Sequence, residues 1–292
     1  MAASIIQCTD VKKSFGKKPV MKGLDLEVPK GSVFGLLGIN GAGKTTLIKL
    51  LTGLLKPDAG TISLLDDDPL GFTDFTKERF GYVPQKARLY PWLTVAQIVA
   101  YTASFYSRWD HVLIEHLIKS WRIDPDERIG NLSEGEAQKV MIVLALGHHP
   151  ELLILDEPVA SLDPGARRQF LKIILELVAD RECTVFFSTH ITSDLERVAD
   201  RVALLKDGTV AFCGEMEAVK ENVKRIRIIG AGPTPDDLET EHVLGYQRSE
   251  HGLLLTVKNY DENLHERLRE RFQGELLVED LNLEEIFLEL NR

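Results

Sequence analysis

The sequence contains few cysteines. Only Cys8, Cys183 and Cys213 occur among 292 residues; they lie far apart, and no CxxC pair is present. Disulfide frameworks and structural zinc sites need cysteines in even number or at short, regular spacings. We therefore expect neither kind of site, and a reduced cytosolic compartment is the simplest interpretation of the cysteine content.

Long hydrophobic runs are also missing. Apolar stretches such as LLIL at 152–155 are far shorter than the roughly 18 residues that a membrane-spanning helix needs. The first ten residues, MAASIIQCTD, lack the basic segment followed by a long apolar segment that is typical of a signal peptide. We expect a cytoplasmic protein that does not itself cross a bilayer but can dock onto a membrane partner.

Basic residues are in the minority. The chain has 35 lysines and arginines against 45 aspartates and glutamates, a formal net charge of −10. Proteins that bind nucleic acid usually present a basic face, so we expect no nucleic-acid partner. The length and the 44% hydrophobic content suffice for one large domain or two ordinary ones with buried cores.

Short apolar runs alternate with helical patterns along the first two thirds of the chain. Continuous apolar strands that alternate with helices favour an α/β fold, in which a parallel sheet is covered on both faces. A hairpin is expected at 201–214, with its turn at Asp207-Gly208. The expected strands are 32–38, 152–156 and 183–189, and the expected helices are 44–54, 165–179 and 193–199.

Two segments depart from this alternation. The residues from 94 to 150 are mostly helical in pattern and predict a helical subdomain, at about 88–150, inserted into the α/β core. After residue 222 the composition changes, and GAGPTPDD at 230–237 is typical of a linker. We expect domains at 1–222 and 223–292, the second a small α+β accessory domain with strands at 242–247, 253–259 and 275–280 and helices at 262–272 and 283–290.

A glycine-rich loop, GINGAGKTT, follows the first of these strands and opens the next helix. It fits the pattern G-x-x-x-x-G-K-[ST], in which backbone N–H groups surround the phosphates of a nucleotide. In this pattern Lys44 bridges to the terminal phosphates, and the Thr45 hydroxyl binds magnesium. The core is thus expected to be of the P-loop NTPase, RecA-like type, and the residues expected to bind ATP are Gly38, Asn40, Gly41, Ala42, Gly43, Lys44, Thr45 and Thr46.

An acidic pair ends a second apolar strand, in LLILDEP at 152–158. Asp156 stands at the strand tip, where it is expected to hold Mg²⁺. Glu157 follows, where it can polarise a water molecule aimed at the terminal phosphate and act as the general base.

Taken together, these motifs resemble those of the ATP-binding cassette (ABC) ATPases over about residues 4–220. The resemblance rests on GINGAGKT, YVPQ, LSEGE, LLILDEP, SLD at 161–163 and STH at 188–190, in that order. It implies that Gln85 contacts magnesium and the attacking water, that His190 contacts the γ-phosphate, and that Asp163 links the two sites of a dimer. Phe15 stands where the family stacks an aromatic ring on adenine.

The stretch NLSEGEAQK at 131–139 departs from the family, in which this loop is commonly LSGGQ and closes over the ATP of the other subunit. Ser133 and Gly135 are retained, whereas Glu134 and Glu136 are changes. Ser133 and Glu136, three residues apart before a helical run, form the pattern of a capping box. We expect an adapted phosphate-contacting loop; the alternative is a capped helix start with no role in ATP binding.

The resemblance extends to bacterial subunits that serve a separate permease, because FYSRWD at 105–110 and the final LNLEEIFLEL are similar to theirs. It implies an ATP-hydrolysing subunit that forms a dimer, expected to be a homodimer, around two ATP molecules. Such a subunit drives a transmembrane permease, in this case for export, from the inner face of the membrane. The alternative is a soluble ABC ATPase of the iron–sulfur-assembly or DNA-repair type, whereas a binding module without turnover is disfavoured by Glu157.

One further feature concerns the end of the helix that follows Ser133. His148 and His149 close this helix, and a basic residue there is expected to complement the negative end of the helix dipole.

Overall fold

The structure is a computed structural model that describes residues 3–86, 89–179, 183–229, 242–249, 252–272 and 275–290. The chain divides into two compact units, Met1–Cys213 and Gly214–Arg292, and each is described by itself. The linker predicted at 230–237 lies outside the described residues. Among those residues, no helix is both long enough and apolar enough to cross a membrane.

A six-stranded sheet in the order β5-β6-β7-β3-β8-β9 forms the centre of the first unit. Neighbouring strands from β5 to β8 run parallel. Every residue of β3, β6 and β7 is buried, which agrees with their continuous apolar runs. The strands are β3 (Val33–Leu37), β5 (Phe80–Val83), β6 (Leu152–Asp156), β7 (Thr184–Thr189), β8 (Arg201–Lys206) and β9 (Thr209–Glu215).

The hairpin predicted between β8 and β9 is confirmed. Its two turn residues, Asp207 and Gly208, have φ angles of 51° and 83°. Positive φ at both central residues is the geometry of the tight turn that matches the twist of paired strands. The Asp-Gly pair favours this turn because both residues tolerate the left-handed region.

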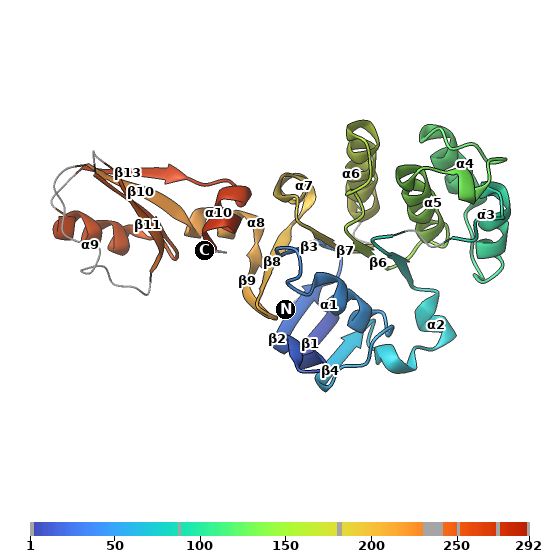
Figure 1. The fold of residues 1–292 in the computed structure, drawn as a ribbon, viewed down its shortest axis with the longest axis horizontal. Helices are drawn as coiled ribbons and strands as arrows, with labels where there is room; N and C mark the ends of the chain where they lie inside the picture. The colour runs from blue at the N-terminus through green and yellow to red at the C-terminus, as the bar shows by residue number, and fades with distance from the viewer. Residues whose placement is uncertain are drawn as a thin grey trace. The chain divides into compact units, whose positions relative to one another are not determined.

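Helices cover the central sheet on both faces (Figure 1). Helix α1 (Lys44–Leu51) lies on one face, and α6 (Pro164–Ala179) and α7 (Thr192–Val198) lie on the other. The predicted α/β fold class is therefore confirmed. Helix α1 is shorter than the predicted 44–54 because Gly53, with φ of 70°, takes the left-handed conformation that ends helices.

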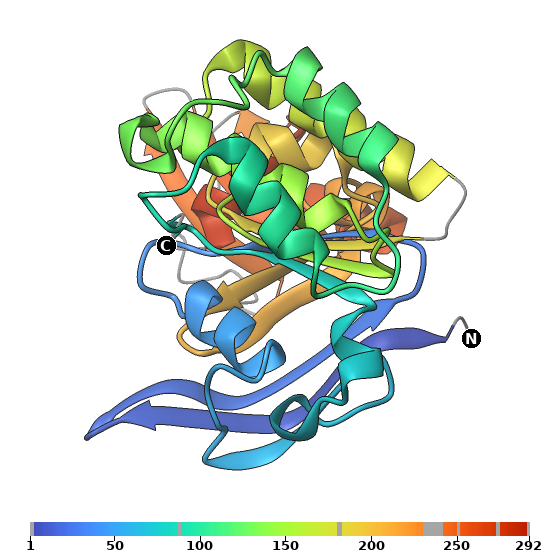
Figure 2. The ribbon, with the colours of Figure 1, turned by 90° about the vertical axis from the view of Figure 1, so that its right-hand side faces the viewer.

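A second sheet, which the sequence patterns did not predict, packs on the far side of α1. It is antiparallel, in the order β2-β1-β4, and Figure 2 shows it as the lowest layer. Its side chains share one buried core with α1 and with β3 and β6. The strands are β1 (Ser4–Phe15), β2 (Lys18–Pro29) and β4 (Ala59–Leu64).

The helical segment predicted between residues 94 and 150 is present between β5 and β6. Its three α-helices begin at capping residues: Thr94 and Ser133 with capping boxes, and Asp110 with a bond to Leu113 N. The helices of this region are α3 (Val95–Ala103), α4 (His111–Ser120), η2 (Ile129–Asn131) and α5 (Glu134–Leu146). Two short helices, η1 (Pro69–Gly71) and α2 (Asp74–Lys77), lie before it, between β4 and β5.

The expectation that His148 complements the dipole of α5 is wrong. His148 is buried, its ring stacks on Tyr106 at 4.1 Å between centroids, and its Nε2 lies 3.3 Å from the carbonyl oxygen of Phe80. Burial lowers the pKa of His148 to about 4, so the ring is neutral near pH 7 and carries no charge to offer the dipole. His149 is half exposed and pairs with Asp110 at 2.8 Å.

The buried His148 makes the stability of this region sensitive to acid. The unfolded chain binds a proton near pH 6.5 and the folded chain only near pH 4. The free energy of unfolding is therefore not reduced by His148 above pH 6.5. As the pH falls from 6.5 toward 4, it decreases by up to about 3 kcal/mol, because only the unfolded chain binds the proton readily. His148→Phe, which keeps the stacking, is expected to remove this part of the acid sensitivity.

All three tryptophans, Trp92, Trp109 and Trp121, lie in the segment between β5 and β6. Urea unfolding of wild type and His148→Phe followed by tryptophan fluorescence between pH 7 and pH 4.5 therefore tests this expectation. His116→Phe, on the exposed face of α4, is the control. Equal losses of stability in His148→Phe and wild type would contradict the prediction.

The second unit contains a four-stranded antiparallel sheet in the order β11-β12-β10-β13. Leu264, Leu268 and Phe272 recur every four residues along α9 and are buried against the sheet. The predicted strands and helices after residue 242 are confirmed, whereas α8 and β10 were not predicted. The elements are α8 (Met216–Asn222), β10 (Lys224–Ile229), β11 (Val243–Ser249), β12 (Gly252–Val257), α9 (Glu262–Phe272), β13 (Glu275–Asp280) and α10 (Leu283–Leu290).

Candidate functional site

The glycine-rich loop joins the end of β3 to the start of α1. Gly41 and Gly43 have φ angles of 85° and 110°, which residues with a Cβ rarely adopt. A Cβ on Gly43 would also lie 2.4 Å from the Met21 side chain. The two glycines therefore allow the loop to curl at the N-terminus of α1, where free N–H groups and the helix dipole attract phosphate.

Lys44 is held at the base of this loop. Its Nζ donates to the carbonyl oxygen of Gly38 at 2.7 Å and lies 3.2 Å from Oε1 of Glu157. Both side chains of this ion pair are almost fully buried, at 6% and 5% exposed. A buried charge needs a partner, so the pair joins the loop after β3 to the acidic end of β6.

Asp156 ends β6 and faces the start of α1. Its Oδ1 accepts hydrogen bonds from Thr45 Oγ1 at 3.2 Å and from Ser188 Oγ at 2.9 Å. The parallel register places Ser188 of β7 directly beside Asp156. Burial raises the pKa of Asp156, although the bonds from Ser188 and Thr45 oppose the change.

The remaining oxygen of Asp156 indicates a cation. Oδ2 is buried and has no hydrogen-bond partner among the described residues. A buried carboxylate oxygen without a partner is costly, and Mg²⁺ prefers oxygen ligands such as a carboxylate and a hydroxyl. The pair formed by Asp156 and Thr45 therefore fits Mg²⁺.

Glu157 is held in a strained position by contacts from three directions. Its φ of 50° lies in the left-handed region, which costs about 1–3 kcal/mol for a residue with a side chain. Its N–H donates to Ser188 Oγ at 3.1 Å, its Oε1 faces Lys44, and its Oε2 lies 2.9 Å from Nδ1 of His190. Strain of this kind collects at functional sites.

Gln85 and Phe15 lie at the margins of this group. Gln85 is exposed and comes two residues after the end of β5. Because β5 and β6 are parallel neighbours, Gln85 lies at the same edge of the sheet, formed by the carboxyl ends of the strands, as Asp156. Phe15 ends β1, is 50% exposed, and has the Lys13 ammonium 5.9 Å from its ring centroid. An exposed ring with a cation nearby can stack on a base.

The loop containing Ser133 opens α5 through the predicted capping box. Glu136 N donates to Ser133 Oγ, while one oxygen of Glu136, Oε2, accepts from both Ser133 N at 2.9 Å and Ser133 Oγ at 2.7 Å. The hydrogen bond from the Ser133 hydroxyl lowers the pKa of Glu136. The carboxylate of Glu136 is thus folded back onto Ser133, and Glu134 is exposed.

Asp163 caps α6 and lies next to the Ser133 loop in the same chain. Its Oδ1 accepts from the N–H groups of Gly165 and Ala166, and its Oδ2 lies 3.6 Å from Lys139 Nζ of α5. A Cβ on Gly135 would lie 2.7 Å from the carbonyl oxygen of Ser161. The absence of a side chain at Gly135 therefore allows α5 to start against the loop that carries Asp163.

The predicted site residues thus form two groups. Lys44, Thr45, Asp156, Glu157 and His190 are joined by hydrogen bonds and ion pairs. The second group consists of the Ser133 loop and Asp163, and no hydrogen bond or ion pair joins it to the first within the described part of the chain.

Sequence reasoning missed two residues of these networks, Ser188 and Lys139. The hydroxyl of Ser188 donates to Asp156 and accepts from the N–H of Glu157. The sequence feature that could have indicated this role is a serine near the end of a buried strand, two residues before His190. Lys139 of α5 forms an ion pair with Asp163, and no pattern in the sequence marked it.

Comparison with known proteins shows the family to which this chain belongs. The family model described as ABC transporter matches residues 21–160. Nod factor export ATP-binding protein I of Burkholderia lata is 33% identical over 298 aligned positions, covering 99% of this chain and 98% of that protein. This chain belongs to the family of ABC transporter ATP-binding proteins.

Solved structures agree with this ABC assignment. An ATP-binding subunit of an ABC transporter is similar with a TM-score of 0.69 and 29% identity, over 75% of this chain and 92% of that one. A bacterial ABC transporter cassette solved as a dimer has the same fold, with a TM-score of 0.65 and 22% identity over 72% and 98% of the two chains. As a member of the ABC family, the chain binds ATP and is an ATPase.

Proposed function

We propose that this ABC ATPase is the cytoplasmic motor subunit of a bacterial exporter, peripheral to the inner face of the membrane through a separate permease. Glu157 carries the proposal: it is buried beside the phosphate loop, between Lys44 and His190. A carboxylate in this place can accept a proton from water as the water attacks the γ-phosphate.

The residues divide the chemistry as follows. The glycine-rich loop and Lys44 bind the phosphates of ATP, and Phe15 stacks on adenine. Bound Mg²⁺ supplies positive charge to the phosphates; Thr45 and Asp156 hold it, and Gln85 completes the set from the end of β5. His190, whose Nδ1 contacts Glu157, leaves its other ring nitrogen for the γ-phosphate.

A second copy of the chain is proposed to complete each site. No hydrogen bond or ion pair joins the Ser133 loop or Asp163 to the phosphate loop within the described part of the chain, whereas Lys139 of α5 pairs with Asp163. In a head-to-tail homodimer, the Ser133 loop closes over the ATP held by the other chain. The dimeric bacterial cassette of the same fold supports this arrangement.

Export is favoured over the soluble alternative by the extent of the match. The similarity to the Nod factor export protein covers almost the whole of both chains, so it includes the C-terminal unit. A permease on a separate chain, rather than a nucleic acid, is therefore the proposed partner.

Purification with the membrane partner tests the proposal. A tagged Glu157→Gln chain, isolated with ATP and Mg²⁺ from detergent-solubilised membranes of its own cells, is expected to carry a polytopic membrane protein in a fixed ratio. Reconstituted in vesicles, the wild-type pair should hydrolyse ATP faster than the isolated chain. A chain that remains in the soluble fraction and reaches its full rate alone would favour the soluble alternative.

The folded-back Glu136 predicts a restraint on dimerisation. While the Ser133 hydroxyl donates to Glu136, its single proton is not available for phosphate, and the carboxylate adds negative charge near ATP. Glu136→Gln keeps a capping box and removes the charge. ATP-dependent dimerisation is expected to strengthen by about fivefold, the equivalent of about 1 kcal/mol.

Analytical ultracentrifugation in the Glu157→Gln background, at low and high salt, measures this effect. Glu134→Gln is the matched control, because it removes the same charge from the same turn at an exposed position. The gain in Glu136→Gln should shrink at high salt. A weaker dimer in Glu136→Gln, or an equal gain in Glu134→Gln, would argue against the restraint.

Residues 223–292 are proposed to form a separable accessory domain that tunes the ATPase. Every residue assigned to ATP binding lies in the unit Met1–Cys213. A chain ending at Asn222 is therefore expected to bind ATP with nearly full affinity, measured by calorimetry. A truncated chain that is folded by circular dichroism but binds no ATP would contradict the separation.

A further inference from the structure

His190 depends on support from outside its own turn. It stands between the end of β7 at Thr189 and the start of α7 at Thr192, and its side chain is 47% exposed. The N-cap of α7 is Ile191, which provides no capping hydrogen bond from its side chain. Reacting groups must be held to within about 0.5 Å of their working positions, so the backbone of this turn has to be fixed for the imidazole to stay on Glu157.

A buried ion pair holds the first turn of α7. Asp194 is 1% exposed, and its Oδ1 accepts from Arg167 Nε at 2.7 Å and lies 2.6 Å from Arg167 Nη2. Arg167 Nη2 also lies 3.5 Å from Ser193 Oγ. One guanidinium group of α6 thus contacts two successive residues of α7, which come three and four residues after His190.

Arg167 is itself fixed on α6. Its backbone N–H donates to the carbonyl oxygen of Asp163 at 2.9 Å, and the Asp163 side chain caps the same turn. Ala166 and Phe170, which flank Arg167 along the helix, are buried. Arg167 therefore joins the capped start of α6, which follows Asp163, to the start of α7, which follows His190.

The buried charge of Asp194 makes this contact necessary. Its second oxygen, Oδ2, is buried and has no hydrogen-bond partner among the described residues. An ionised carboxylate that loses its partner in a buried position is strongly destabilised. Without Arg167 the carboxylate would turn toward water, and the first turn of α7 would move with it. His190, four residues earlier, would then leave the Oε2 atom of Glu157.

We propose that Arg167 is a positioning residue for ATP hydrolysis. Through Asp194 it fixes the first turn of α7, and this turn keeps His190 on Glu157. The inference rests on the proposed roles of Glu157 and His190 at the γ-phosphate. No hydrogen bond or ion pair joins Arg167 to the phosphate loop within the described ranges, so Arg167 acts on the rate of hydrolysis and not on the binding of ATP.

Arg167→Gln in the full chain is expected to lower kcat by about ten- to a hundredfold, since a displacement of about 1 Å at a reacting group costs up to about a hundredfold. The KM for ATP should stay nearly unchanged, because the lost contact supports the transition state and not the binding of ATP. Arg167→Lys keeps the charge opposite Asp194 but not the planar fork of donors, so its kcat should fall less. Phosphate release with ATP and Mg²⁺ measures both constants.

A double-mutant cycle with His190 tests the route of action. In a His190→Ala chain the imidazole is absent, so Arg167→Gln should lower kcat no further. If Arg167 only stabilised the fold, its effect would add to that of His190→Ala. Thermal unfolding with ATP must show that each variant is folded. Arg167→Lys, which keeps Asp194 paired, replaces Arg167→Gln in the cycle if the latter does not fold.

NMR of the chain labelled at its histidine rings reports the surroundings of His190 without reference to turnover. The His190 signal, assigned by its absence in His190→Ala, should shift in Arg167→Gln. A shifted signal together with wild-type hydrolysis by Glu157→Gln would leave the support by Arg167 in place and refute the role of Glu157. An unshifted signal together with slow hydrolysis by Glu157→Gln would overturn the role of Arg167 alone.

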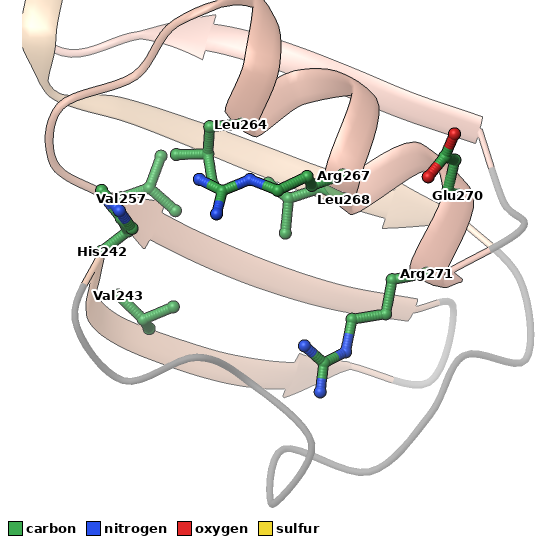
Figure 3. A pocket seen from close by; sticks show the side chains of 8 residues that line it. All are labelled: His242, Val243, Val257, Leu264, Arg267, Leu268, Glu270 and Arg271. Atoms are coloured by element: carbon green, nitrogen blue, oxygen red, sulfur yellow. The ribbon is translucent and has the colours of Figure 1, made fainter.

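Two other arginines supply matched controls. Arg168→Gln removes the same charge from the next residue of α6, which is exposed and donates to the Pro164 carbonyl oxygen of its own helix. Arg271→Gln removes one from the C-terminal unit, where Arg271 lines a cavity of about 370 Å³ between α9 and the strands β11 and β12 (Figure 3). Both variants should keep the kcat and the His190 signal of wild type.

A wild-type kcat in Arg167→Gln would overturn the proposal, as would a raised KM for ATP without a fall in kcat. Additive effects of Arg167→Gln and His190→Ala would show that Arg167 does not act through the imidazole. An equal loss of kcat in Arg168→Gln or Arg271→Gln would show that the loss of a positive charge, and not of the contact with Asp194, lowers the rate.

Discussion

Glu157→Gln is expected to lower the rate of ATP hydrolysis by about 10²–10⁴-fold, the range that a general base contributes. The amide keeps the size of the side chain and can still bond to Lys44 and His190, but it cannot accept a proton from the attacking water. ATP binding should persist because the phosphate loop is unchanged. The variant should therefore collect as an ATP-bound dimer.

Phosphate release and size-exclusion chromatography with ATP and Mg²⁺ measure the two parts of this prediction. Glu115→Gln, on the exposed face of α4, is the control for loss of a carboxylate. Loss of Glu157 also leaves the buried Lys44 without its ion-pair partner, so thermal unfolding with ATP present must show that the variant is folded. A Glu157→Gln protein that hydrolyses ATP at the wild-type rate would rule out Glu157 as the base.

Ser133→Arg is expected to lower hydrolysis by about a hundredfold or more, the cost of misplacing groups around a reacting phosphate. Binding of ATP to the monomer should be nearly intact, because that site is built from Lys44, Thr45 and Phe15. Ser133→Ala removes the helix cap, at about 0.5–2 kcal/mol, without adding bulk. Ser133→Ala should therefore be milder if the arginine acts by blocking the dimer interface.

Mixing Ser133→Arg with Lys44→Ala distinguishes action across subunits from action within one chain. In a mixed head-to-tail dimer, one composite site contains both substitutions, and the other joins an intact phosphate loop to an intact Ser133 loop. Partial recovery of hydrolysis is expected from the intact site. Absence of recovery would indicate that the two sites must act together, whereas normal hydrolysis by Ser133→Arg alone would mean that the loop is only a capped helix start.

The local elements were predictable because their causes are local. The glycine-rich loop needs Gly41 and Gly43 for its left-handed backbone, and the β8–β9 turn needs Asp207 and Gly208 for the same reason. The capping box at Ser133 depends on two residues three positions apart. The apolar runs of β3, β6 and β7 by themselves indicated a sheet buried on both faces.

The strands of the second sheet were harder to recognise from their sequences. β1 mixes buried and exposed residues without regular alternation, and its register against β2 shifts at several points. The pattern of period two is therefore interrupted in β1, although residues 24–28 of β2 alternate regularly between buried and exposed. Packing against α1 then decides which residues of β1, β2 and β4 are buried.

The chemical state of the site residues was decided by tertiary structure. The sequence by itself determined that Lys44, Asp156, Glu157 and His190 stand at the ends of strands or the start of a helix. Only the parallel register brings Ser188 beside Asp156 and His190 onto Glu157. The loss of water around a charged group depends on all the elements that surround it. The buried Lys44–Glu157 pair and the neutral His148 therefore follow from the fold and not from the sequence pattern. The cavity under α9 likewise exists only in the folded chain.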